Sequence, residues 1–327
     1  MSIAFVTGGT GFIGSHTVEQ LINQGIHVRC LVRPNRKNLE WISGLPVETV
    51  TGDLLAPGTI ADAVRDADYI IHIAGVTRAK RRKDFFDGNV VATRNLLEAC
   101  AKATGLKKFC FLSSLTATGP SPNGVPVDED TACNPISAYG RSKLDAERSC
   151  LSPGKPFPVV ILRPPTVYGP RDKDVLEVFR AAKMGIQPNV GSTNKTLSLI
   201  YGPDLAEVIV KATLTDKTDG KTYFVSDPAI YEQARMFGIV GDLVGSKSIR
   251  IKLPPFLVYS AAALVEALSY FGPRPALLSR DKARDMAQDH WVCNPQRIKQ
   301  DIAFETRTNA EMGLKATYEW YKEKKWI

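Results

Sequence analysis

The sequence has few residues of the kinds that build disulfide frameworks or metal centres. It contains six cysteines and four histidines in 327 residues. The cysteines show no Cys-x-x-Cys or other metal-type spacing, and several of them lie in apolar or helical stretches. This pattern is typical of free, buried thiols in a reducing cytoplasm, and we expect no bound metal. The cysteines stand at positions 30, 100, 110, 133, 150 and 293.

The sequence also lacks a hydrophobic run long enough to cross a membrane. The longest apolar segment, residues 255–271, carries Glu266 and falls short of the roughly 20 apolar residues that a spanning helix needs. The chain begins with a strand-like segment, residues 3–7, in place of a basic stretch followed by a signal-type apolar run. We therefore expect neither a membrane span nor export.

Charge of one sign is not concentrated in any long region. The formal net charge is +8, but the basic residues are spread along the chain, whereas nucleic-acid binding needs them focused on one surface. The one dense run comprises Arg78 and residues 80–83, and it is either a solvated loop or a contact for an anion or substrate. We expect a small-molecule substrate and no nucleic-acid partner.

Short apolar runs alternate with helical patterns through the first half of the chain. Such alternation predicts an α/β fold with a Rossmann-type, doubly wound parallel sheet. After about residue 170 the alternation loosens and prolines recur. We expect a dinucleotide-binding domain at 1–170 and a smaller substrate lobe at 171–327, interleaved with the sheet. The predicted strands are 3–7, 27–32, 47–51, 69–73, 108–112 and 159–162, and the predicted helices are 16–24, 60–65, 90–102 and 138–150.

A glycine-rich loop connects the first predicted strand to the first predicted helix. The segment at 7–14 is Thr-Gly-Gly-Thr-Gly-Phe-Ile-Gly, with glycines three residues apart. Glycine lets the chain turn tightly and lets its backbone amides approach a pyrophosphate at the helix N-terminus. Because strand, loop and helix occur in the required order, we predict a dinucleotide site. Its residues in this loop are Gly8, Thr10, Gly11, Phe12, Ile13 and Gly14.

The end of the second predicted strand favours one dinucleotide over the other. NAD-binding sites place an acid there to hold the ribose 2′-hydroxyl. Residues 31–37 are Leu-Val-Arg-Pro-Asn-Arg-Lys and contain no acid before Glu40. Arg33 and Arg36 can instead bind a 2′-phosphate, although a basic surface turn remains the alternative. We predict NADP(H), with NAD(H) less favoured.

Two further strand ends have residues that suit the same cofactor. Asp53 and Leu54 follow the third predicted strand, where an adenine contact is usual, although an acid that begins a loop also suits a plain turn. Ala74 and Gly75 follow the fourth and are small enough for the cofactor to pass close to the backbone.

A tyrosine and a lysine four residues apart form the predicted chemical centre. Tyr139 and Lys143 lie in a helical pattern, so both side chains fall on one face. A nearby ammonium and the positively charged nicotinamide of the cofactor favour phenolate, so together they can lower the pKa of the tyrosine from about 10. Ser114 ends the predicted strand at 108–112 and can stabilise the charge that develops on a substrate oxygen. We predict Ser114, Tyr139 and Lys143 as the catalytic residues.

Taken together, these segments resemble the extended short-chain dehydrogenase/reductase family over nearly the whole chain. The resemblance implies a Rossmann-type sheet, a Ser/Tyr/Lys site with Ser114 as the serine rather than Ser113, and a C-terminal substrate lobe. It also implies cofactor contacts at Asn89, Pro164, Thr166 and Val167. The segments that carry it are TGGTGFIG at 7–14, Asp53-Leu54, HIAG at 72–75, Asn89, the strand end FLSS, YGRSK at 139–143, LRPPTVYGP at 162–170, the stretch 201–206 with Asp204, and the Trp-Tyr pair near the C-terminus.

The family includes nucleotide-sugar epimerases and dehydratases, and the sequence departs from both. Dehydratases have an Asp-Glu pair directly after the catalytic hydroxyl, where this chain has Leu115 and Thr116. Nucleotide-sugar enzymes hold the diphosphate with an arginine seven residues before the aspartate that matches Asp204, where this chain has Leu197. The closest resemblance is to the dihydroflavonol-4-reductase and 3β-hydroxysteroid dehydrogenase-like branch.

That branch implies an NADP(H)-dependent enzyme that interconverts a ketone and a secondary alcohol on an apolar substrate. The alternatives are an NAD-using nucleotide-sugar epimerase and, less favoured, a non-catalytic NADP(H)-sensing protein. The segment 254–291 resembles the apolar helix and lobe of the steroid dehydrogenase-like members. That helix could wall a substrate pocket, touch a membrane surface peripherally, or be an ordinary core helix.

Family resemblance also implies a homodimer. Its members commonly dimerise through the helix of the Tyr-x-x-x-Lys motif and the helix before it. Here these would be residues 138–149 and 90–103, with Leu96, Leu97 and Leu144 able to face a partner. The alternative is that these leucines belong to the core of a single chain.

Overall fold

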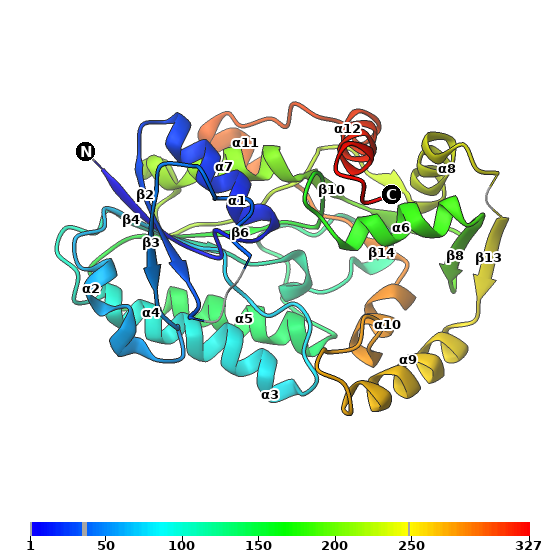
Figure 1. Ribbon diagram of the computed structural model, residues 1–327, viewed down its shortest axis with the longest axis horizontal. Helices are drawn as coiled ribbons and strands as arrows, with labels where there is room; N and C mark the ends of the chain where they lie inside the picture. Colours follow the sequence, from blue (N-terminus) through cyan, green and yellow to red (C-terminus); the bar gives the residue numbers. More distant parts are fainter. Residues whose placement is uncertain (1, 35–37, 248) are drawn as a thin grey trace.

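Seven parallel strands form the central sheet of the computed structural model, which describes residues 2–34, 38–247 and 249–327. The strand order is β11-β6-β5-β4-β1-β2-β3, so the chain winds outward from β1 in both directions (Figure 1). This order confirms the predicted Rossmann-type fold. The strands are β1 (Ile3–Thr7), β2 (His27–Val32), β3 (Val47–Thr51), β4 (Tyr69–His72), β5 (Lys108–Leu112), β6 (Val159–Arg163) and β11 (Thr222–Phe224).

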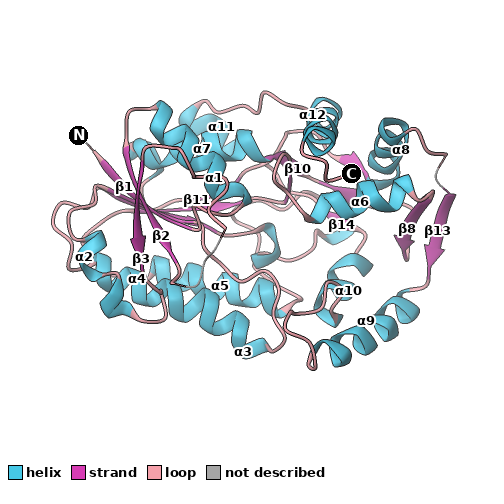
Figure 2. Ribbon diagram, in the orientation of Figure 1, coloured by secondary structure: helices cyan, strands magenta, loops and turns pink. Residues whose placement is uncertain are grey.

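The strands are apolar on both faces because helices cover both faces. In β1, Ala4 and Val6 point into one core cluster, whereas Phe5 points into the other. Figure 2 shows the two helical layers on either side of the sheet. The first layer contains α1 (Phe12–Asn23), α7 (Gly202–Leu214) and α11 (Gln296–Ile302), and the second contains α2 (Ala61–Val64), α4 (Ala92–Cys100) and α5 (Ala138–Leu151).

The helix predicted from residue 90 begins earlier than the sequence pattern indicated. Helix α3 (Arg82–Phe85) continues through a π-helical turn (Phe86–Val91) directly into α4. The Asp84 carboxylate caps its start by accepting a hydrogen bond of 3.2 Å from the Arg81 amide. The basic run is therefore only partly a loop, because its last two residues lie in α3.

The C-terminal lobe is built from short strand pairs and helices. A core of aromatic and aliphatic side chains joins α6, α8 and α12. The strand groups are β7 (Thr166–Tyr168) with β10 (Leu199–Tyr201), β8 (Ile186–Val190) with β13 (Ile249–Leu253), and β12 (Tyr231–Glu232) and β14 (His290–Trp291) flanking β9 (Thr196–Leu197). The helices are α6 (Asp174–Lys183), α8 (Gln233–Val244), α9 (Pro255–Ser269), α10 (Arg280–Ala287) and α12 (Ala310–Glu323). Single turns of 3₁₀-helix occur at Pro57–Thr59, Leu115–Ala117, Pro122–Gly124 and Asp216–Thr218.

The two halves of the sequence are not separate in space. Strand β11 pairs with β6 at the edge of the sheet, and α7 packs against α1. The chain returns to the sheet a third time as α11, where Asp301 accepts hydrogen bonds from Lys221 and from the Tyr223 hydroxyl. A boundary at residue 170 therefore divides the sequence but does not divide the core.

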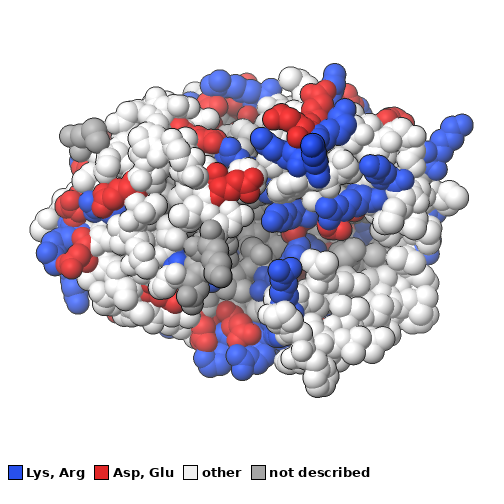
Figure 3. All heavy atoms as spheres, in the orientation of Figure 1, with Lys and Arg blue, Asp and Glu red and all other residues white. Residues whose placement is uncertain are grey.

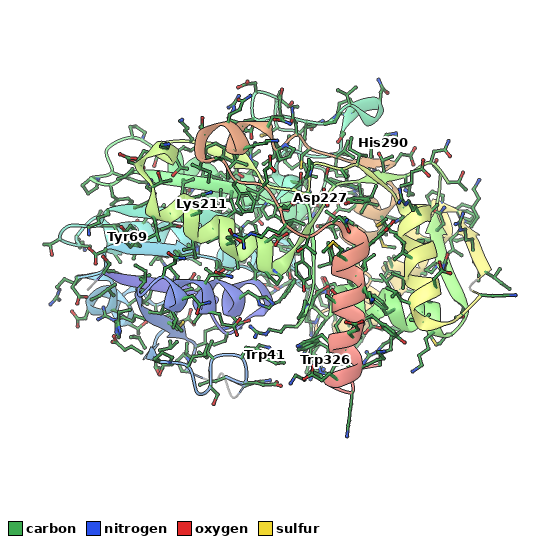
Figure 4. All side chains as sticks on the ribbon, turned by 90° about the horizontal axis from the view of Figure 1, so that it is seen from above. Trp41, Tyr69, Lys211, Asp227, His290 and Trp326 are labelled. Carbon is green, nitrogen blue, oxygen red and sulfur yellow. The ribbon has the colours of Figure 1, made fainter. Side chains whose placement is uncertain are left out.

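Three tryptophans join the loop after β2 to the end of the chain. The ring of Trp41 lies 5.7 Å from that of Trp320 and 6.2 Å from that of Trp326. Figure 4 shows Trp41 and Trp326 close together beside the end of α12. The guanidinium of Arg171 lies 5.3 Å above the Trp41 ring. This cluster fixes the segment that follows the predicted 2′-phosphate turn.

Candidate active site

The glycine loop between β1 and α1 is packed so closely that a side chain would not fit at Gly8 or Gly14. Gly8 has a φ of +78°, and a Cβ there would lie 2.7 Å from the backbone nitrogen of Ala74. A Cβ on Gly14 would lie 2.1 Å from the carbonyl oxygen of Gly8. Gly11 stands at the N-cap of α1, where no side chain caps the helix. The first amides of α1 are therefore available to a pyrophosphate, which fits a dinucleotide cofactor.

The other predicted residues of this loop lie around the start of α1. Thr10 and Ile13 are half-buried, and Ile13 packs against the first core cluster. The Phe12 ring fills the space above Gly202, where a Cβ would lie 2.7 Å from the ring. Phe12 therefore anchors α1 against α7 and so fixes the helix whose N-terminus faces the predicted pyrophosphate.

A chain of buried hydrogen bonds lies beneath the loop and holds two strand ends together. His72 Nδ1 lies 2.7 Å from the Thr7 hydroxyl, and its Nε2 lies 2.9 Å from the Thr93 hydroxyl. Burial, together with the charge on Lys143, lowers the pKa of His72 to about 3. The imidazole is therefore neutral at physiological pH. No local sequence pattern indicated this role for the histidine.

Asn89 fixes the backbone that follows β4. Its Oδ1 accepts a hydrogen bond of 2.7 Å from the Val76 amide, and its Nδ2 donates to the Ser142 hydroxyl at 2.8 Å. A Cβ on Gly75 would lie 3.1 Å from Asn89 Oδ1 and 3.8 Å from Lys143 Nζ. The absence of a side chain at Gly75 lets its backbone lie directly beside Asn89 and Lys143. A direct contact of Asn89 with the cofactor stays a prediction.

The residues predicted to bind the adenosine end lie at the ends of β2 and β3. Arg33 is exposed directly after β2, while Arg36 lies outside the described residues. Asp53 is half-buried and its Oδ1 accepts from the Leu55 amide at 2.9 Å, as in a simple Asx turn. Leu54 is buried, and its carbonyl accepts from Asn95. Their roles toward a cofactor stay predictions.

Ser114, Tyr139 and Lys143 come together at the C-terminal ends of the central strands. The hydroxyl of Ser137 caps α5 by accepting from the Gly140 amide, which places Tyr139 in the first turn of the helix. Lys143 lies one turn later, and its buried Nζ donates to the Leu112 carbonyl at 2.6 Å. The same Nζ lies 4.2 Å above the Phe111 ring.

The neighbouring serines have different partners. Ser113 is buried and its hydroxyl donates to Glu147, which also forms a buried ion pair of 2.6 Å with Arg163. The Ser114 hydroxyl accepts hydrogen bonds from the Thr116 amide and hydroxyl, at 3.2 and 2.9 Å. The Ser114 proton is therefore directed to the site, where it can be donated to Tyr139 or to a substrate oxygen, whereas the Ser113 hydroxyl is engaged by Glu147.

Burial is the largest influence on the pKa values of Tyr139 and Lys143. It raises the pKa of Tyr139 to about 12, against a hydrogen bond with Ser114 that lowers it, and the charge of Asp285 raises it further. Within the chain itself, a buried phenolate loses more hydration than its neighbours restore. The expected lowering of the pKa of Tyr139, which includes the charge of a bound nicotinamide, stays a prediction. Burial also lowers the pKa of Lys143 to about 8, although Glu147 opposes this.

Helix α10 contributes residues that sequence reasoning missed. The Asp281 carboxylate accepts from the Ala138 amide at 2.8 Å, and Arg284 donates to the Ile136 carbonyl at 3.1 Å. Asp285 Oδ1 is buried without a hydrogen-bond partner among the described residues, and burial raises the pKa of this carboxyl to about 6. These contacts join positions 143 to 148 residues apart, so no local pattern could have revealed them.

The segment after β6 lies beside Ser114 and Leu115, which follow β5. Pro164 is buried, and its carbonyl accepts from the Leu115 amide at 2.8 Å. Thr166 is exposed and Val167 half-buried on β7, where they pair with Leu199 and Ile200. Their predicted contacts with the nicotinamide end stay predictions.

Leu197 occupies the position where nucleotide-sugar enzymes carry an arginine. It is half-buried in β9, between Tyr231 of β12 and Trp291 of β14. Asp204 is nearby in sequence but accepts hydrogen bonds from the amides of Arg307 and Thr308, so it anchors the C-terminal segment. The substrate lobe thus has an apolar side chain where a diphosphate would need a cation.

Comparisons with known proteins identify both reductases and nucleotide-sugar enzymes. The chain is 28% identical to a ceramide reductase of Caulobacter vibrioides over 99% of its own length and 96% of that protein. It is also 28% identical to a 2-alkyl-3-oxoalkanoate reductase of Shewanella oneidensis, over 96% and 85% of the two chains. The crystal structure of a UDP-glucuronic acid 4-epimerase from Bacillus cereus with NAD matches with a TM-score of 0.79 at 22% identity, over 98% and 99% of the chains.

A family model covers the sheet and the catalytic segment together. It is described as the NAD dependent epimerase/dehydratase family and matches residues 4–226, which include the glycine loop and the Tyr139–Lys143 helix. This match confirms the resemblance to the extended short-chain dehydrogenases, a family of enzymes that use nicotinamide cofactors and include reductases. The chain belongs to the NAD dependent epimerase/dehydratase family.

Proposed function

We propose that the protein is an NADP(H)-dependent oxidoreductase that interconverts a ketone and a secondary alcohol on an apolar, lipid-like substrate. The observation that carries the proposal is the convergence of Ser114, Tyr139 and Lys143 at the strand ends, beside Gly75. These three side chains supply a hydroxyl donor, a proton source and a buried ammonium within one site.

The bound nicotinamide cofactor would supply the hydride. In the reducing direction, Tyr139 donates its proton to the carbonyl oxygen as the alcohol forms, which suits a phenol whose pKa of about 12 keeps it protonated. Ser114 donates a hydrogen bond to the same oxygen and stabilises its developing charge. Lys143, held at the Leu112 carbonyl, stabilises the phenolate that is left and binds the cofactor ribose.

An apolar substrate fits the lobe better than a nucleotide sugar. Leu197 lies between Tyr231 and Trp291 of the two neighbouring strands. Nucleotide-sugar enzymes have the diphosphate-binding arginine at this position. Leu115 and Thr116 replace the Asp-Glu pair of the dehydratases. Two relatives, a ceramide reductase and a 2-alkyl-3-oxoalkanoate reductase, act on a lipid and on a 3-oxo acid with an alkyl group, which supports an apolar ketone as substrate.

NADP(H) is the proposed cofactor because Arg33 follows β2, and because no acid stands between it and Glu40. We also propose a reducing compartment, the cytoplasm, which the six unpaired cysteines support. A homodimer and a peripheral membrane contact complete the proposal.

The test measures NADPH oxidation by absorbance with a long-chain 2-alkyl-3-oxoalkanoate, a steroid-like ketone and an aromatic ketone. UDP-glucose with NAD is assayed in parallel for C4 epimerisation. We expect turnover of at least one apolar ketone, and none of the sugar. Faster conversion of the nucleotide sugar would replace the reductase by the epimerase. Cofactor binding without turnover of any substrate would instead indicate a sensing protein.

A second measurement tests the cofactor. Replacing Arg33 and Arg36 together by alanine should weaken NADPH binding by about 10-fold or more, because a charge-assisted phosphate contact contributes about 1.5–3 kcal/mol. NADH affinity should hardly change. Replacing Arg65, an exposed arginine on another loop that pairs with Asp62, is the control. Equal losses for both dinucleotides would show that these arginines do not select the 2′-phosphate.

A further inference from the structure

Helix α9 differs from an ordinary surface helix in its solvent-facing side chains, which are apolar where polar ones are usual. The stripe that faces the protein comprises Val258, Ala262 and Glu266, at helical spacing. Val258 and Ala262 join a small cluster with Val190 and Ala283. The rest of the helix surface, which would normally be polar, is apolar and faces solvent.

The exposed face is large and carries no charge. Phe256 is 68% exposed, Leu264 63%, Leu268 61% and Phe271, just beyond the helix, 92%. Single exposed apolar residues are ordinary, but a contiguous set indicates a binding surface. Leu257, Tyr259, Val265 and Tyr270 extend the same face.

The one charged residue of α9 is turned away from this face. The side chain of Glu266 is 15% exposed and accepts hydrogen bonds from the backbone and the guanidinium of Arg280. The carboxylate is thus neutralised by its partner on α10. A charge on the outer face would oppose contact with an apolar phase, and this helix has none there.

Basic residues stand beside the apolar face. The basic run at 78–83 contacts the end of α9, since the Tyr270 hydroxyl donates to the Lys80 carbonyl at 2.8 Å and Lys80 Nζ donates to the Gly272 carbonyl. Three cations of the basic run form ion pairs, Arg78 with Asp174, Arg81 with Asp84 and Lys83 with Asp87. Arg82 and Arg274 are exposed and form no ion pair among the described residues, so these two are the cations available to headgroups. Figure 3 shows the corner at α9 almost uniformly white, with blue and red side chains together beside it at α3.

We propose that α9 and the adjoining basic run form a docking surface for an anionic lipid bilayer. Helix α9 lies in the membrane interface, its outer face enters the acyl boundary, and the basic run contacts anionic headgroups. No helix among the described residues is long and apolar enough to span a bilayer, and the 15 residues of α9 extend only about 22 Å.

The position of α9 relates the proposed membrane contact to the delivery of a lipid substrate. Helix α9 packs against α10, and α10 holds the N-terminal turn of the catalytic helix α5 through Asp281. A lipid leaving the bilayer at α9 would therefore enter beside Tyr139. This use rests on the proposed function, but the membrane contact itself does not.

The experiment measures co-sedimentation of the full chain with vesicles. One set is phosphatidylcholine alone, and the other contains equal amounts of phosphatidylcholine and phosphatidylglycerol. We expect sedimentation with the anionic vesicles, weakened by added salt because charge contributes. The double variant Leu264→Glu, Leu268→Glu should lose about 10-fold or more in vesicle affinity, because two carboxylates cannot enter the acyl boundary without loss of hydration.

The matched control is Leu151→Glu, Met312→Glu, which places the same charges at apolar positions that are 51% and 58% exposed on α5 and α12. This control should sediment like the unchanged protein, and both variants should fold, since no buried side chain is altered. Arg82→Gln with Arg274→Gln should reduce binding to the anionic vesicles alone.

Three outcomes would overturn the proposal: no sedimentation of the unchanged protein, equal binding by the α9 variant, or a dimer that the α9 variant makes monomeric. The last would show that a second copy covers the face. Vesicle binding needs no turnover, so Tyr139→Phe should bind normally. Failure here would leave the reductase proposal intact, and failure of the ketone assay would leave the docking surface intact.

Discussion

Tyr139 and Lys143 are both driven toward their neutral forms by burial. The phenol, with a pKa of about 12, is a proton donor throughout the physiological range, while the ammonium, with a pKa of about 8, is only partly protonated in mild alkali. Proton donation to a carbonyl therefore agrees with the site as it stands. The reverse reaction needs the phenolate, so it should be favoured at higher pH.

Replacing Tyr139 by phenylalanine removes only the hydroxyl. The ring contact with Phe85, at 6.2 Å between centroids, is retained, so stability and NADPH affinity should change little. Loss of a positioned proton donor should lower kcat by about 10² to 10⁴. Steady-state kinetics and NADPH titration measure the two effects separately. Near-normal turnover would mean that the hydroxyl is only a packed polar group.

Lys143→Met should impair both chemistry and binding. The lysine lies beside Gly75 and is proposed to support the phenolate and to bind the ribose, so its loss should lower kcat and also weaken NADPH affinity. The same two assays distinguish it from Tyr139→Phe, which should affect kcat alone. A Lys143→Met enzyme with unchanged NADPH affinity would argue against a ribose contact.

Because of His72, the free energy of unfolding should decrease at acidic pH. Its pKa is lowered from 6.5 to about 3 in the folded chain, so the unfolded chain binds the extra proton between these values. Stability is therefore fully present above about pH 6.5 and lost as pH falls, by about 2–3 kcal/mol between pH 7 and pH 4.5. Urea unfolding at several pH values measures this loss.

In His72→Gln that part of the pH dependence should vanish, whatever the substitution costs at pH 7. His27→Gln is the control, because His27 lies at the surface against Glu48. An unchanged slope in His72→Gln would show that other groups cause the acid sensitivity.

Sequence patterns revealed the residues whose neighbours are local. The glycines of the loop and the Tyr139–Lys143 pair follow from spacing within a few positions. Glu147 with Arg163, and Asp285 with the first turn of α5, depend on how separate segments fold together. The preference for Ser114 over Ser113 came from alignment with the family, and the structure supplies a physical reason, the engagement of Ser113 by Glu147.

At the scale of elements, a side chain of α10 caps the N-terminus of α5, the helix that carries the predicted catalytic residues Tyr139 and Lys143. Asp281 accepts from the first amide of α5, where a negative charge also complements the helix dipole. Asp281→Ala should destabilise the protein by about 0.5–2 kcal/mol and lower kcat, because Tyr139 lies in the turn that is held. Thermal unfolding and kinetics measure both.

NADPH affinity should change little in that variant, because Asp281 holds the first turn of α5, whereas Lys143 lies one turn later at the Leu112 carbonyl. Asp281→Asn keeps an acceptor oxygen and should restore most of kcat. Equal damage from both substitutions would indicate that the charge matters more than the hydrogen bond.

The helix that precedes α5 illustrates why element boundaries were harder to predict. Periodicity indicated a start at residue 90, whereas the structure begins at Arg82 and passes through a π-helical turn. That turn breaks the 3.6-residue period on which the prediction depended. It also places Asn89 where its side chain contacts both Val76 and Ser142.

For the whole molecule, the proposed homodimer needs a different contact from the one expected. Leu96, Leu97 and Leu144 are buried within the single chain, so the expectation that they face a partner is wrong. The outer surface of α4 and α5 instead exposes charged side chains, including Arg94 and Arg148. A dimer through these helices would be held by polar contacts.

Light scattering at micromolar concentration should give the mass of a dimer. Arg94→Glu with Arg148→Glu should yield monomers, because the charges at the contact are reversed. The α9 variant Leu264→Glu, Leu268→Glu should leave the mass unchanged. A monomer in the unchanged protein would contradict the dimer.

The sheet was predictable because its strands are continuous apolar runs with helices between them. The lobe was not, because its strands are two to five residues long and pair between distant segments. Such pairs have no periodicity to detect, and their partners are set by the tertiary fold.

The late arrival of β11 and α7 at the sheet affects how the protein is made. Ribosomes add about 5–20 residues per second, so β6 emerges several seconds before the strand that pairs with its edge. During that interval the nascent chain presents an unpaired strand edge and the apolar face that α7 covers later. A chaperone that shields nascent chains should therefore raise the yield of native protein, and synthesis that stalls shortly after residue 170 should favour aggregation.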